Sequence, residues 1–146
     1  EMLMASMMGA IAFQKDLGAV HSCAHALSTV ADLHHGLANG VMIDHVMGFN
    51  LPSAVAKMAE LARVCGAPGG ASGSEEARAA SFIVWLRELK ASIGIPAKLS
   101  DVKGGRPVTR ADLPRLVEVA YADLCHQTNP RKCARSDFEA LFASAL

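Results

Sequence analysis

Apolar side chains that recur every three or four residues constrain the fold of this chain more than any other feature. The pattern begins with Met4, Met7, Met8 and Ile11, and it is typical of an α-helix with one apolar face. The apolar content of 51% is rich in Ala, Leu, Met and Val, whereas aromatic residues make up only 5%. Straight-chain side chains lose little rotamer freedom in a helix. The sequence therefore predicts an all-α fold with almost no strand.

Capping and helix-breaking residues divide the pattern into a bundle of about seven helices. Their expected ranges are 2–13, 19–30, 36–49, 52–65, 74–93, 109–124 and 136–146. Pro52 suits a first turn, and Ser74 offers a cap oxygen to the free amides of the fifth helix. Ser136, three residues before Glu139, is expected to start the last helix.

Three side-chain patterns add detail to this bundle. Thr109 and Asp112 resemble a capping box at the start of the sixth helix. The residues from 66 to 73 are rich in Gly, Ala, Pro and Ser, and they predict a surface loop. The fifth helix is expected to direct four side chains inward, namely Phe82, Trp85, Leu86 and Leu89.

Length and charge limit the class of protein. A chain of 146 residues is the size of one domain with one core. Its 14 basic and 14 acidic residues balance, so no net field attracts nucleic acid or an anionic membrane. The longest apolar stretch, 2–13, is too short for a span of about twenty residues. Four scattered cysteines fit a reducing cytoplasm. Because the chain starts inside a helical pattern, we expect a truncated domain.

Histidines give the strongest chemical signal. Five of the six lie between His21 and His45. His21 and His25 are four residues apart, so on a helix they point the same way with Cβ atoms about 6 Å apart. Neutral imidazole is the commonest protein ligand for a divalent transition metal. One straight helix would hold His35 about 21 Å from His21, but a break before Gly36 would let two helices fold back and bring them together.

From the residues alone, a metal site and a set of packed, hydrogen-bonded histidines remain equally open. His45 is expected to be structural, His34 to be a partly exposed turn residue, and His126 either to line a pocket or to face water. No Gly-x-Gly-x-x-Gly follows a strand, and no phosphate loop is present. Nothing in the chain would hold a dinucleotide alone.

Several separated motifs together resemble the signature of the iron-containing alcohol dehydrogenases. They are Ala12-Phe13-Gln14-Lys15, Leu17-Gly18-Ala19-Val20-His21, Ala24-His25-Ala26-Leu27, His35-Gly36-x-x-Asn39, Phe49-Asn50 and Asn129-Pro130-Arg131. The resemblance implies that residues 1–146 form the C-terminal, all-helical, metal-binding domain of the dehydroquinate synthase-like fold. The N-terminal nucleotide-binding domain of that fold would be missing.

The resemblance also assigns roles to individual residues. His21 and His35 match metal ligands, and His25 matches a histidine beside the metal that orients substrate or relays a proton. Phe13 and Cys125 match positions near the nicotinamide. The other two ligands of the family, an aspartate and a histidine, would lie upstream of this chain.

Three aspartates are left out of this assignment. Asp16 stands where relatives usually carry glycine, and Asp32 is expected in a turn or cap, so neither is assigned to the metal. Asp44 stands where relatives commonly have proline, a change that we expect the fold to tolerate.

The implied enzyme is an NAD- or NADP-dependent alcohol dehydrogenase that contains Fe(2+), with Zn(2+) possible on chemical grounds. It would interconvert a small alcohol and an aldehyde or ketone, and the isolated chain should be inactive. A maleylacetate reductase-like relative and a non-catalytic helical scaffold are the alternatives. The partners expected are the substrate and the missing domain, with self-association through the first helix.

Overall fold

The protein is described here by a computed structural model that covers residues 1–146. It has no strand, and its α-helices are α1 (Met2–Ala12), α2 (Ala19–Ala31), α3 (His35–Asn50), α4 (Val55–Val64), α5 (Glu75–Ser92), α6 (Leu113–Ala122) and α7 (Arg135–Ala145). Short 3₁₀ helices join them: η1 (Phe13–Lys15), η2 (Leu51–Ser53), η3 (Leu99–Asp101), η4 (Arg110–Asp112) and η5 (Leu124–Thr128). The prediction of an all-α bundle of about seven helices is confirmed.

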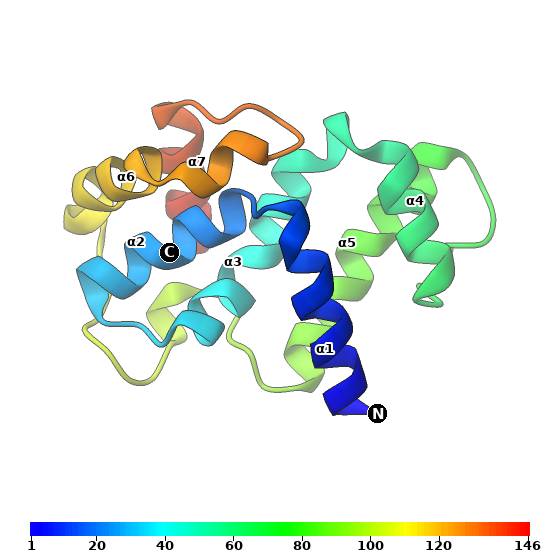
Figure 1. The fold of residues 1–146 in the computed structure, drawn as a ribbon, viewed down its shortest axis with the longest axis horizontal. Coiled ribbons are helices and arrows are strands. Elements are labelled where there is room, and N and C mark those ends of the chain that lie inside the picture. The colour runs from blue at the N-terminus through cyan, green and yellow to red at the C-terminus, as the bar shows by residue number, and fades with distance from the viewer.

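Helix α3 runs between two groups of helices (Figure 1). On one side α2, α6 and α7 enclose the larger core of 19 buried residues, in which Phe138 and Phe142 are fully buried. On the other side α4 and α5 pack around a smaller core of 8 buried residues, and Ile43 and Met47 of α3 pack against it. The side chains of α3 therefore connect both cores.

Local capping signals located most helix starts correctly. The Ala77 amide donates to Ser74 Oγ at 3.2 Å, and the Thr109 amide donates to Asp112 Oδ2 at 2.8 Å. That second box opens η4, which leads directly into α6.

Two of the expected starts differ from the structure, by three residues for α4 and by one for α7. Pro52 lies in η2, and α4 begins only at Val55. The last helix is capped by Asp137, whose side chain accepts from the Ala134 amide at 2.8 Å, rather than by Ser136 and Glu139. The capping interaction therefore lies two residues earlier than the one expected between Ser136 and Glu139, and α7 begins at Arg135.

The inward face of α5 differs from the expectation at one position. Phe82 and Leu86 are buried and Trp85 is half-buried, but Leu89 is 39% exposed. Its neighbour Lys90 takes the inward position and is only 4% exposed. A buried charge therefore replaces the apolar contact that periodicity predicted.

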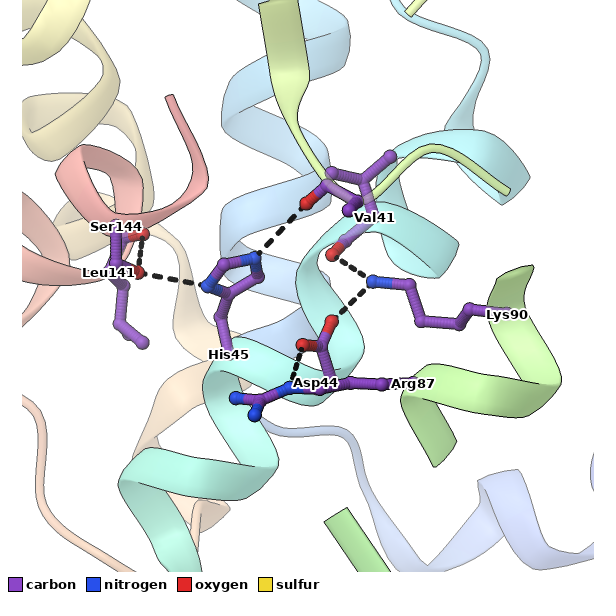
Figure 2. A network of polar contacts seen from close by, with 8 residues as sticks. Val41, Asp44, His45, Arg87, Lys90, Leu141 and Ser144 are labelled. Atoms are coloured by element: carbon purple, nitrogen blue, oxygen red, sulfur yellow. Dashed lines mark hydrogen bonds and ion pairs between the residues drawn. The ribbon is translucent and has the colours of Figure 1, made fainter. Parts of the chain in front are cut away.

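Lys90 belongs to a cluster that we call the ion-pair cluster, formed by Asp44, Arg87 and Lys90 (Figure 2). Lys90 Nζ donates to Asp44 Oδ1 and to the Val41 carbonyl, the latter at 2.8 Å, and Arg87 Nε donates to Asp44 Oδ2 at 2.9 Å. Burial would raise the pKa of Asp44, but the hydrogen bonds from Lys90 and Arg87 outweigh it and lower that pKa. Asp44 is thus accommodated as an ion-pair partner.

Helix α1 has no buried residue. Met2, Leu3, Met4, Met7, Met8 and Ile11 are each more than half exposed. The expected helix is present, but its apolar side chains face solvent. None of the chain's helices combines the length and the hydropathy that a membrane crossing requires.

Candidate metal centre

The start of α2 is fixed by the opposite end of the chain. The Ala19 amide donates to Asn129 Oδ1 at 3.2 Å. Asn129 in turn exchanges hydrogen bonds with Asn50 at 2.7 and 3.0 Å. A Cβ atom at Gly18 would lie 3.1 Å from Asn129 Oδ1, so glycine allows this close approach. The Asn129 side chain therefore does the capping that the residue before α2 cannot do.

Two aspartates with positive φ lie on either side of α2. Asp32 has φ 54°, and its amide donates to the Ser28 carbonyl at 3.1 Å, so it caps the end of the helix as expected. Asp16 has φ 72°, a conformation that favours glycine. A glycine at this position would adopt the same backbone conformation without strain. The reversal after Asp32 allows α3 to begin at His35, beside α2.

The reversal brings three imidazoles together, which we call the histidine cluster: His21, His25 and His35. The ring centroids of His21 and His35 are 5.4 Å apart, those of His25 and His35 5.1 Å, and those of His21 and His25 6.0 Å. Burial, together with the neighbouring His35 and His25, lowers the pKa of His21. A neutral imidazole is the form that binds metal.

His25 has a carboxylate partner that the sequence reasoning missed. Its Nδ1 lies 2.8 Å from Asp123 Oδ2. The other carboxylate oxygen accepts from Ser22 Oγ and from the Cys125 amide, both at 2.8 Å. Burial would raise the pKa of Asp123, but these hydrogen bonds lower it to about 2. An ionised carboxylate only accepts, so Nδ1 of His25 carries the proton.

His35 has a weaker partner on its own helix. Its Nε2 lies 2.9 Å from Asn39 Nδ2, which also donates to the His35 carbonyl at 3.0 Å. Asn39 Oδ1 is buried and has no donor. An ion bound at His35 Nε2 would displace this amide, which is only partly satisfied where it lies. Two imidazoles from packed helices fit one half of a divalent metal site.

Two cavities lie near the histidine cluster, and His21 lines the larger one. The larger, about 580 Å³, lies among η1, α2, α3 and α4, is largely apolar, and is lined by Phe13, His21 and Asn39 among others. The smaller, about 390 Å³, is lined by Phe13, Asp16 and Cys125 among others. Phe13 faces both cavities and meets the His21 ring edge-on at 5.9 Å. The structure thus places both residues assigned to the nicotinamide beside the cluster.

The remaining histidines lie elsewhere. His34 is exposed at the cap of α3. His45 Nδ1 lies 2.9 Å from Ser144 Oγ (Figure 2), in a structural position between α3 and α7. His126 stacks on Tyr121 at 5.5 Å and meets Phe138 edge-on at 5.4 Å. Packing rather than ligation accounts for the last two.

Relatives of known name match most of this chain. It is 35% identical over 129 residues to lactaldehyde reductase of Escherichia coli (strain K12), covering 88% of this chain and 32% of the relative. It is 36% identical over 147 residues to 1,3-propanediol dehydrogenase of Klebsiella pneumoniae, and this match covers 99% of this chain and 36% of the relative. The chain thus spans about a third of the length of these relatives.

A solved structure and a family model agree with these matches. The structure of a 1,3-propanediol oxidoreductase is 34% identical and has a TM-score of 0.82, covering 89% of this chain and 33% of that chain. The model of the Fe-containing alcohol dehydrogenase family, C-terminal, matches residues 1–146. The chain therefore belongs to the iron-containing alcohol dehydrogenase family and corresponds to its C-terminal region.

Proposed function

We propose that the chain is the C-terminal, metal-binding domain of an NAD(P)-dependent alcohol dehydrogenase that interconverts a small alcohol and an aldehyde or ketone. The observation that carries the proposal is the convergence of His21, His25 and His35 from two helices beside an apolar cavity. The relatives' names point to small alcohols and aldehydes as substrates. Residues upstream of this chain would bind most of the dinucleotide.

In this proposal His21 and His35 hold a divalent ion together with ligands from the upstream domain. A bound ion supplies Lewis-acid stabilisation of negative charge on the substrate oxygen, while the nicotinamide carries the hydride. Family membership favours iron, whereas two imidazole donors would hold zinc at least as well. The lowered pKa of His21 keeps its ring neutral and able to ligate.

His25 orients the substrate or relays a proton. Asp123 accepts from Nδ1, so the Nε2 lone pair remains available to accept a proton from an alcohol. Ser22 and the Cys125 amide hold the carboxylate in place. Phe13 and Cys125 would border the nicotinamide, and Phe13 contacts the His21 ring at the edge of the larger cavity.

A chimera tests the proposal. The C-terminal third of the Klebsiella pneumoniae 1,3-propanediol dehydrogenase is replaced by this chain, and reduction of NAD or NADP by small alcohols is measured. We expect metal-dependent activity that His21→Ala and His35→Ala abolish, whereas the neighbouring His34→Ala retains it. A folded, metal-loaded chimera without activity would contradict the proposal.

The chain alone gives the complementary test. It offers two of the expected ligands and one wall of the cleft, so the purified 146 residues should reduce neither NAD nor NADP with any alcohol. Detectable alcohol-dependent reduction by the isolated chain would overturn the assignment of the missing ligands to an upstream domain.

A further inference from the structure

We propose that His25, Asp123 and Cys125 form a second metal site, separate from the His21–His35 pair, that takes a thiophilic divalent ion such as Zn²⁺. The site uses His25 from α2, Asp123 from the junction between α6 and η5, and Cys125 from η5. It does not depend on the dehydrogenase activity proposed above.

The donor atoms already lie close together. An imidazole nitrogen of His25, a carboxylate oxygen of Asp123 and Sγ of Cys125 are all within 4.8 Å of one another. Zinc bond lengths of about 2.0–2.3 Å place tetrahedral donors roughly 3.3–3.6 Å apart. Shifts of about 1 Å would therefore close a three-ligand site, and water would complete the tetrahedron.

The carboxylate is oriented for such an ion. Asp123 Oδ1 accepts from Ser22 Oγ and from the Cys125 amide. This leaves Oδ2 with His25 Nδ1 as its partner. Carboxylates that bind metal are usually oriented by hydrogen bonds from neighbouring groups. Here these bonds fix one oxygen, and the other oxygen can face the ion. The ion would replace the proton that Nδ1 and Oδ2 now share.

Proton balance follows from this replacement. The Nδ1 proton of His25 is transferred through water to Nε2, so that Nδ1 gains a free lone pair. The Cys125 thiol gives its proton to water as the sulfur–metal bond forms. One proton is released per ion, and no oxidation or reduction takes place.

The thiolate determines which ion binds. Sulfur ligands select zinc and cobalt over magnesium or calcium, which prefer oxygen. Cys125 lines the cavity of about 390 Å³ and is reachable from solvent there, and Asp16 adds a carboxylate to the same cavity. An ion at this site engages His25 and separates it from Asp123. If His25 has the role proposed above, zinc at this site inhibits the enzyme.

Cobalt spectroscopy tests the site in the 146-residue chain. We expect Co²⁺ to produce a thiolate-to-cobalt charge-transfer band that saturates at one equivalent and that Zn²⁺ removes. The band should be lost in Cys125→Ser and in Asp123→Ala. It should persist in Cys133→Ser, which changes another half-buried cysteine, and in His21→Ala.

Alkylation provides a second readout that needs no variant. Zn²⁺ should slow alkylation of Cys125, followed by mass spectrometry, and should leave the exposed Cys65 unaffected. The proposal is overturned if folded wild-type chain gives no thiolate band, if the band survives Cys125→Ser, or if zinc leaves Cys125 unprotected. Cobalt binding without a thiolate band would point to His21 and His35, and it would leave the proposed function intact.

Discussion

The ion-pair cluster and the histidine cluster both place charged or titratable groups at contacts of α3, yet they differ in how fully their atoms are satisfied. In the ion-pair cluster both oxygens of Asp44 and the ammonium of Lys90 have partners, and both residues are 4% exposed. In the histidine cluster three rings face one another, but only His25 has a carboxylate. The fully hydrogen-bonded groups of the ion-pair cluster hold α3 to α5. The ring nitrogens of the histidine cluster that lack a charged partner remain free to bind a ligand.

The largest effect on stability is expected when the ion pair between Asp44 and Lys90 is broken. Asp44→Ala leaves the buried Lys90 ammonium without its counterion, and it should lower the free energy of unfolding by about 3–5 kcal/mol. Urea denaturation of the purified chain measures this. Lys90→Met should cost less, because Asp44 keeps its hydrogen bond from Arg87. Equal losses below about 1 kcal/mol for both variants would mean that the cluster behaves as a surface ion pair.

An intermediate effect is expected in binding rather than in stability. His35 is exposed, so His35→Ala should change the free energy of unfolding by less than about 0.5 kcal/mol. It should weaken zinc binding at least about tenfold, measured calorimetrically in a Cys125→Ser background that removes the thiolate. His34→Ala, one residue away, is the matched control. Equal zinc affinity of the two variants would mean that His35 is not a ligand, and the histidine cluster would then not differ from the ion-pair cluster in its ability to bind metal.

The smallest effect concerns pH and His45, which lies next to the ion-pair cluster. Burial, assisted by Lys90 and Arg87, lowers its pKa against the opposing influence of Asp44 and the Ala97 carbonyl. The unfolded chain then binds more protons than the folded chain, so stability falls as pH drops below the ordinary value of 6.5. His45→Gln should make this fall shallower. Melting temperatures at pH 7 and pH 5 provide the measurement, and an unchanged difference would exclude His45 as a contributor.

Local chemistry explains what the sequence could predict. Helix starts such as Ser74 follow from side chains that bond amides three residues away, and His21 and His25 are related by a single helical turn. The fold-back that brings His35 to His21 required only a break between adjacent helices. These features depend on neighbours within a few residues or on the reversal of one turn.

Contacts between distant segments could not be predicted in this way. Asp123 meets His25 across 98 positions of sequence, and Lys90 meets Asp44 across 46. The expectation for Leu89 was wrong because periodicity gave no sign that Lys90 would find a carboxylate inside the fold. A buried charge is stable only with its partner, and the partner is set by tertiary packing.

The cap of α2 by Asn129 has a consequence for how the protein is made. Ala19 and the residue that caps it are 110 positions apart, and synthesis proceeds at roughly 5–20 residues per second, which is a delay of roughly 5–20 seconds. For most of that interval the nascent chain carries His21, His25 and His35 but neither Asp123 nor Asn129. An ion that reaches the proposed metal site before Asn129 is made would therefore meet histidines on a helix whose first turn is not yet capped.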